Sequence, residues 1–153
     1  VTTFTLFEHI SKGNLNGAIL ALHSFMDAEA NKLPLLLATL SWQLRRLLSL
    51  TELLDAGLDM KSAFLEVKAN GKSSAIVIPK DKTLYESAAN RYTLQDCRAI
   101  LATIAEWDKS VRSNPTDVHR TIGDTCLYQI IIKKGRKADK LLFSSLIASP
   151  IEY

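Results

Sequence analysis

A leucine-rich segment constrains the fold of this chain more than any other feature. Between Leu33 and Leu54, eleven of twenty-two residues are leucine, with Pro34 just inside the start and Gly57 just beyond the end. Proline is tolerated in the first turn of a helix and glycine is common after the last, so we predict one long helix here. The segment is interrupted by polar residues at Gln43, Arg45, Arg46 and Glu52. A membrane-spanning helix needs about twenty apolar residues with few charges, so we expect this helix in the core, packed on several sides.

Apolar residues recur at helical spacing on both sides of this segment. We therefore expect further helices over residues 4–12, 15–26, 59–67, 80–91, 94–113 and 117–134. Asn14 and Thr116 precede two of them as side-chain caps, and Thr93 with Asp96 matches a capping box. Residues 69–79, which contain one glycine, two serines and a final proline, are expected to be irregular. The predicted fold class is all-α, a bundle of six to seven helices.

The length of the chain fits a single domain. With 153 residues, of which 47% are hydrophobic, one core is expected. We assign residues 1–135 to a helical domain and residues 136–153 to a basic and apolar tail or one extra helix. Cys97 and Cys126 are predicted to pack in the core as small apolar residues, which favours a reducing cytoplasm. The first residue is Val and no signal-peptide pattern follows it, so we expect a piece of a longer cytoplasmic protein.

No motif in the chain predicts catalysis. Gly71-Lys72-Ser73 ends like a phosphate-binding loop, but that loop needs a glycine five positions earlier, where this chain has Glu66. We therefore interpret the triplet as a flexible polar loop. The three histidines are scattered, and none has a partner at the spacing of a metal site. We expect no enzyme activity, no cofactor and no metal.

Positive charge is concentrated in the second half of the chain. The net charge is +3, and residues 71–153 hold thirteen of the nineteen Lys and Arg residues. Basic side chains can contact nucleic-acid phosphates whatever the base sequence, although such groups more often form an ordinary solvated surface. The candidates for DNA contact are Lys80, Lys82, Arg91, Lys133 and Lys134. A helical nucleic-acid-binding domain acting alone is therefore one functional hypothesis.

The order of several short motifs resembles a known family. In the first half, the motifs are LFEHISKGN at residues 6–14, WQLRRLL at 42–48 and ELLDAG at 52–57. In the second half, they are AANRYT at 88–93, AEWD at 105–108 and RS at 112–113. In this order and spacing they resemble the C-terminal domain of the delta subunit of the bacterial DNA polymerase III clamp loader. The resemblance covers about residues 3–134, and Arg112 and the segment 68–78 depart from the family pattern.

The resemblance implies a role in assembly. In that family this domain is a helical collar, which joins the other clamp-loader subunits in a hetero-oligomeric ring in the bacterial cytoplasm. Contact with the sliding clamp would come only from an N-terminal module outside this sequence, and contact with primer-template DNA would be weak at most. No membrane partner is implied. Arg45 and Arg46 match the family's arginine motif, where they are expected to pair with acidic groups inside the bundle or across a subunit interface.

Overall fold

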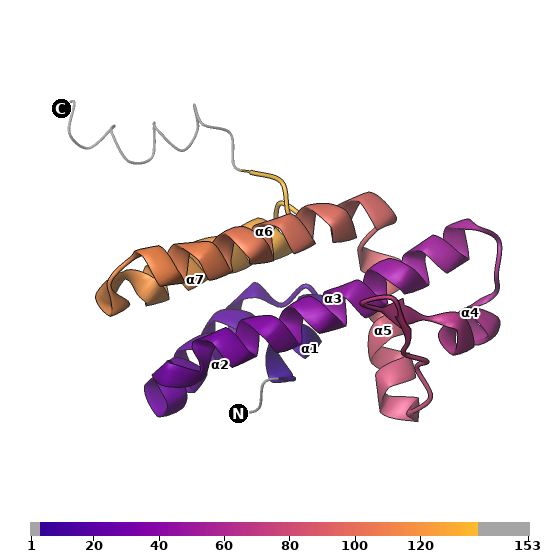
Figure 1. Cartoon of the computed structure of the whole chain (residues 1–153), viewed down its shortest axis with the longest axis horizontal. Helices are drawn as coiled ribbons and strands as arrows, with labels where there is room; N and C mark the ends of the chain where they lie inside the picture. The colour runs from indigo at the N-terminus through magenta and orange to yellow at the C-terminus, as the bar shows by residue number, and fades with distance from the viewer. Residues whose placement is uncertain (1–3, 138–153) are drawn as a thin grey trace.

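The leucine-rich segment forms a single helix, α3 (Leu33–Asp55), through the middle of the molecule (Figure 1). The computed structural model describes residues 4–137 of the chain. The other helices are α1 (Thr5–Ser11), α2 (Leu15–Glu29), α4 (Met60–Glu66), α5 (Pro79–Arg91), α6 (Leu94–Ser113) and α7 (His119–Ile131). A hairpin of β1 (Lys68–Ala69) and β2 (Lys72–Ser73) and two 3-10 turns, Ala30–Lys32 and Thr116–Val118, complete the described elements. The all-α fold class is therefore confirmed.

The leucines of α3 explain its central position. Most of them are buried, including Leu36, Leu37, Leu40, Leu44, Leu47 and Leu50. Several elements bury these leucines: α6 packs alongside α3, and α1, α4, α5 and β1 also contact it (Figure 1). Burying one such side chain contributes about 1.5–3 kcal/mol. The expectation of a core helix packed on several sides is therefore confirmed.

Contacts between α2 and α7 close the bundle. Helix α1 packs on α2, α6 packs on α7, and α2 contacts α7. Two polar contacts join α2 to α7: His23 Nε2 lies 2.7 Å from Asp124 Oδ1, and Arg120 pairs with Asp27. Within residues 4–137, no helix combines the length and hydropathy that a membrane crossing requires.

Two of the three predicted helix caps are present. The Asn14 side chain accepts a 2.9 Å hydrogen bond from a backbone N–H in the first turn of α2. Thr93 and Asp96 form a complete capping box at the start of α6. The prediction for Thr116 is wrong, because α7 begins at His119 without a side-chain cap. The carbonyl of Thr116 instead accepts a hydrogen bond from the N–H of His119, which is the bonding of a 3-10 turn.

The segment expected to be irregular contains a short antiparallel hairpin, β1–β2. Both residues of its turn, Asn70 (φ 55°) and Gly71 (φ 76°), have a left-handed backbone, as a tight two-residue hairpin turn requires. Residues 74–78 then run without regular secondary structure to the start of α5. The N–H of Ile76, which is buried, donates to the carbonyl of Phe64 over 2.8 Å. This segment is therefore irregular in shape but fixed against the core.

The turn after α7 is fixed on α6. Gly135 has a φ of 87°, its N–H donates to the carbonyl of Gln129 over 2.8 Å, and its own carbonyl accepts a 3.0 Å hydrogen bond from the hydroxyl of Thr103. Of the tail predicted over residues 136–153, only residues 136 and 137 are described. The rest of that prediction lies outside the described residues.

Gly135→Ala should destabilise the protein more than Gly71→Ala. Both positions have a left-handed backbone, which costs an L-residue about 1 kcal/mol. A Cβ at position 135 would also lie 2.4 Å from the backbone nitrogen of Ile100, whereas a Cβ at position 71 would meet no atom of the described residues within 4 Å. We expect Gly71→Ala to lower the free energy of unfolding by about 1 kcal/mol and Gly135→Ala by about 2 kcal/mol or more, measured by urea denaturation. Equal losses would contradict the close packing of this turn.

Candidate functional site

Arg46 is buried although it carries a charge. The residue is only 7% exposed. Its guanidinium lies over the rings of Trp42 (4.7 Å to the centroid) and Tyr85 (5.1 Å). Its Nε and Nη2 donate to the carbonyl of Ser74 over 3.3 and 3.2 Å, and Nη2 also donates to the carbonyl of Ala75 over 3.0 Å. Cation–π contact and charge-assisted hydrogen bonds offset the loss of hydration. Arg46 therefore holds the segment 74–78 against α3.

The partners of Arg46 differ from those that the sequence suggested. In the part of the chain that the structure describes, no ion pair joins Arg46 to a carboxylate. Two aromatic rings and two main-chain carbonyls replace the acidic partner expected inside the bundle. The role of Arg46 in this bundle is thus to connect elements that are far apart in the sequence.

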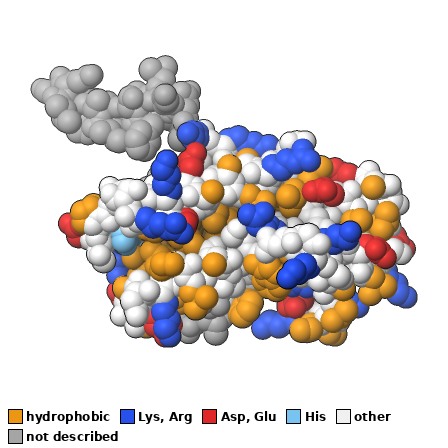
Figure 2. Space-filling model, in the orientation of Figure 1, with side chains coloured by type: hydrophobic (Ala, Val, Ile, Leu, Met, Phe, Trp, Pro, Cys, Tyr) orange, Lys and Arg blue, Asp and Glu red, His pale blue; other side chains and the backbone are white. Residues whose placement is uncertain are grey.

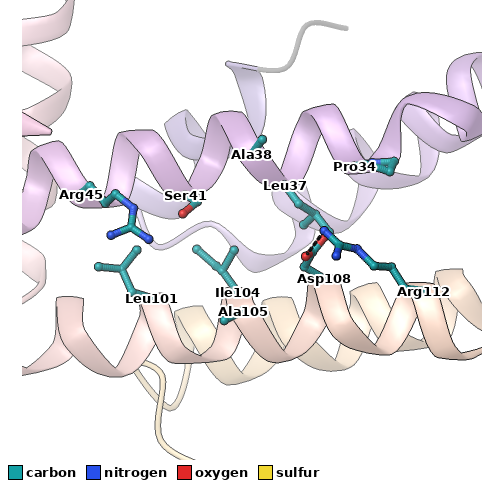
Figure 3. Close-up of a pocket in the computed structure, with 10 residues that line it drawn as sticks. All are labelled: Pro34, Leu37, Ala38, Ser41, Arg45, Leu101, Ile104, Ala105, Asp108 and Arg112. Carbon is teal, nitrogen blue, oxygen red and sulfur yellow. Dashed lines mark ion pairs between the residues drawn. The ribbon is translucent and has the colours of Figure 1, made fainter. Parts of the chain in front are cut away.

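Arg45 lies one residue earlier and faces a groove between α3 and α6 (Figure 3). This α3–α6 groove has a volume of about 260 Å³ and is lined by Leu37, Ala38, Arg45, Ile104, Ala105 and Asp108, among others. Asp108 Oδ2 pairs with Arg112 Nη2 over 2.6 Å. Arg45 is exposed and makes no hydrogen bond or ion pair with the described residues. The groove therefore presents a cation without a partner among the described residues beside an apolar floor. Figure 2 shows that hydrophobic and basic side chains lie next to one another on the visible face of the molecule.

The predicted DNA-contacting residues are only partly brought together. Lys80 is exposed at the start of α5, and Lys82 is half-buried two residues later. Arg91 donates to the carbonyl of Ile131 over 3.2 Å, and Lys134 Nζ donates to the carbonyl of Arg91 over 3.2 Å. Lys133 is half-buried beside them in the sequence. Two of the five basic groups, Arg91 and Lys134, are therefore engaged with the protein's own backbone.

A trough between α1 and α5 connects Lys80, Arg91 and Lys134. It consists of three adjoining hollows: an apolar one of about 510 Å³, a middle one of about 370 Å³ and an open basic one of about 450 Å³. The first two share Glu8, Lys80 and Leu84, and the last two share Lys12 and Ser87. On α5, positions 80, 84, 87 and 91 lie on one helix face. This spacing was visible in the sequence, but only the packing of α1 against α5 turns that face into a trough.

The Gly71-Lys72-Ser73 triplet does not form a phosphate-binding loop. Gly71 occupies the hairpin turn, and Lys72 and Ser73 are exposed in β2. A phosphate loop leads from a strand directly into a helix, whereas residues 74–78 separate this triplet from α5. The interpretation as a polar loop agrees with this geometry.

The described residues contain no cluster typical of a metal or thiolate site. Among them, no group of three or more His, Cys, Asp or Glu side chains could hold a metal ion. Burial raises the pKa of the Cys97 thiol to about 12 and that of the Cys126 thiol to about 11. Both thiols are therefore protonated at neutral pH and pack as apolar groups, as the sequence predicted.

Comparisons with known proteins identify a relative without a stated function. No protein-family model matches the chain, and no solved structure matches it. A stretch of 52 residues, which is 34% of this chain, is 36% identical to a protein of Treponema pallidum (strain Nichols) that is described as uncharacterized. The match covers 68% of that relative.

Arg46→Met should cost far more stability than Arg45→Met. Methionine preserves much of the side-chain volume at position 46 but removes both cation–π contacts and leaves the carbonyls of Ser74 and Ala75 without these donors. We expect Arg46→Met to lower the free energy of unfolding by about 2–3 kcal/mol and exposed Arg45→Met to change it by less than about 0.5 kcal/mol, measured by urea denaturation. Similar values for the two variants would refute the assigned role of Arg46.

Tyr85→Phe should make the stability of the protein less sensitive to high pH. Burial raises the pKa of Tyr85 to about 12, against the opposing effect of the Arg46 guanidinium. The native state thus holds this proton more tightly than the unfolded chain, so its contribution to stability is complete below pH about 10 and is lost as the pH rises toward about 12. The free energy of unfolding of Tyr85→Phe should therefore fall less steeply than that of the wild type over this range.

The same variant should be as stable as the wild type at pH about 7, because the buried Tyr85 hydroxyl has no hydrogen-bond partner among the residues that the structure describes. Tyr128→Phe, at a position 42% exposed, is the matched control and should follow the wild-type pH profile. A Tyr85→Phe profile that coincides with the wild type would contradict the inferred titration.

Proposed function

We propose that this chain, which belongs to the same family as the uncharacterized Treponema pallidum protein, is a helical assembly module equivalent to the collar domain of the clamp-loader delta subunit. In this role it binds the other loader subunits through helix faces in a hetero-oligomeric ring, within the bacterial cytoplasm. It performs no reaction itself and needs no cofactor. Contact with the sliding clamp belongs to a separate N-terminal module in that family.

The α3–α6 groove is the observation that carries this proposal. Its walls include small side chains, Ala38 and Ala105, so a helix of another subunit can approach closely. Arg45 provides a cation at its edge, and Leu35 near the start of α3 is 56% exposed. Interfaces are enriched in arginine beside an apolar centre. This arrangement supports docking of a helix that carries an acidic residue opposite Arg45.

A stand-alone nucleic-acid-binding domain is the second candidate. It is favoured by the position of Lys80, Arg91 and Lys134 along the α1–α5 trough. Binding that depends on phosphate contacts weakens steeply as salt rises, because counterions are released. Association through an apolar groove depends much less on salt. The two functions are therefore separable by the effect of salt.

Co-purification with the remaining clamp-loader subunits tests the assembly proposal. We expect the chain to be retained by those subunits at both low and high salt, and the double variant Arg45→Glu/Ala105→Glu to lose retention because it reverses the charge and blocks the groove. Lys109→Glu, at an exposed position of α6 outside the groove, is the charge-matched control and should be retained like the wild type. Circular dichroism confirms that each variant is folded.

Absence of retention for the folded wild-type chain would refute the assembly proposal. Salt-sensitive binding of the isolated chain to primed DNA, abolished by Lys80→Glu, would favour the second candidate instead.

A further inference from the structure

The apolar hollow of the α1–α5 trough has unsatisfied polar groups in its wall. Gln43 and Tyr85 both line it and are only 4% and 2% exposed. Within residues 4–137, neither the Oε1 of Gln43 nor the hydroxyl of Tyr85 has a hydrogen-bond partner. Leaving such a buried group unpaired costs about 1–3 kcal/mol. In native structures most buried polar groups have a partner, so two unpaired groups distinguish this wall from the rest of the core.

Exposed apolar side chains surround the same hollow. Phe4 and Ile78, which are 55% and 57% exposed, line it together with the half-buried Leu84 and Trp42. Its volume of about 510 Å³ is within the range of pockets that hold a ligand or a large side chain. The hollow is therefore suited to an apolar side chain with a hydrogen-bonding group next to it.

The charge of the trough changes along its length. Its two carboxylates, Glu8 and Asp81, both line the apolar hollow. Glu8 also lines the middle hollow, where its Oε1 pairs with Lys12 Nζ over 3.1 Å. Arg91 and Lys134 line the open basic end together with Lys12, and Lys80 lines both the apolar and the middle hollow. Over the whole trough, cations outnumber carboxylates. A complementary occupant therefore carries its negative charge at one end and an apolar group at the other.

We propose that the α1–α5 trough binds a short acidic segment of a partner protein. One apolar side chain of the segment enters the hollow, and acidic residues at its other end contact Lys12 and Lys134. The twelve residues from Lys80 to Arg91 span about 16 Å at a rise of about 1.5 Å per residue, which an extended peptide covers with about five residues. The trough shares no residue with the α3–α6 groove, so this binding is distinct from the proposed assembly contact.

A peptide fits these features better than a nucleic-acid strand. Phosphates would continue along the whole trough and meet Glu8 and Asp81 at the apolar end, where like charges repel. Of the three aromatic rings that line this hollow, Trp42 and Tyr85 already stack on Arg46, which leaves only the ring of Phe4 for a base. A peptide can place its charges at the basic end alone.

Fluorescence anisotropy with the whole chain tests this proposal. The probe is a labelled peptide, Phe-Gly-Ser-Gly-Asp-Glu-Asp-Glu, and the matched probe has Ser in place of Phe. We expect the first probe to bind at least about tenfold more tightly than the second. Ile78→Ser should remove this preference, and Lys12→Glu/Lys80→Glu should weaken binding of the first probe at least about tenfold. Lys109→Glu, outside the trough, should bind like the wild type.

Several outcomes would overturn the proposal. One is a dissociation constant for the first probe weaker than about 1 mM with the folded wild-type chain. Equal binding of the two probes would show that only net charge is recognised. Tighter binding of an oligothymidylate, lost in the same Lys12→Glu/Lys80→Glu variant, would assign the trough to nucleic acid. None of these results depends on retention by clamp-loader subunits, so failure here is distinguishable from failure of the assembly proposal.

Discussion

The apolar circumference of α3 is the constraint on which the rest of the structure depends. Because its leucines point to most sides, a single neighbouring helix cannot cover them, and the chain arranges α1, α4, α5 and α6 around this axis. The same geometry separates two adjacent arginines. Arg46 turns inward and is solvated by rings and carbonyls, whereas Arg45 faces outward beside the α3–α6 groove. The pair Arg45-Arg46 therefore contributes both to the contact with the segment 74–78 and to the exposed surface beside the α3–α6 groove.

Helix positions were predictable because their signals are local. The capping residues Asn14, Thr93 and Asp96 act within one turn of the backbone that they satisfy, and a glycine or proline near a helix end restricts the chain at that point. Thr116 shows the limit of such signals, since a residue with the right side chain lies in a 3-10 turn. The hairpin had a usable signal in Asn70-Gly71, but its strands are too short to give an alternating pattern.

The candidate sites were much less predictable, because they depend on contacts between distant segments. The sequence identified Arg46 as notable, but its acceptors at Ser74 and Ala75 follow 28 and 29 residues later in a stretch without regular structure. The α1–α5 trough requires two helices separated by more than sixty residues to lie together. Arg91 and Lys134 illustrate the same limit. Both were plausible surface cations, yet each has a main-chain acceptor that only the tertiary structure brings within reach.

The contact between α2 and α7 makes the two ends of the bundle interdependent. A Cβ at position 123 of α7 would lie 2.5 Å from Leu22 of α2, so these helices meet closely at this glycine. Each half of the chain therefore buries apolar side chains of the other half. Cleaving the chain after α5 would separate α6 and α7 from the helices that they cover, so the intact bundle should unfold in one cooperative transition.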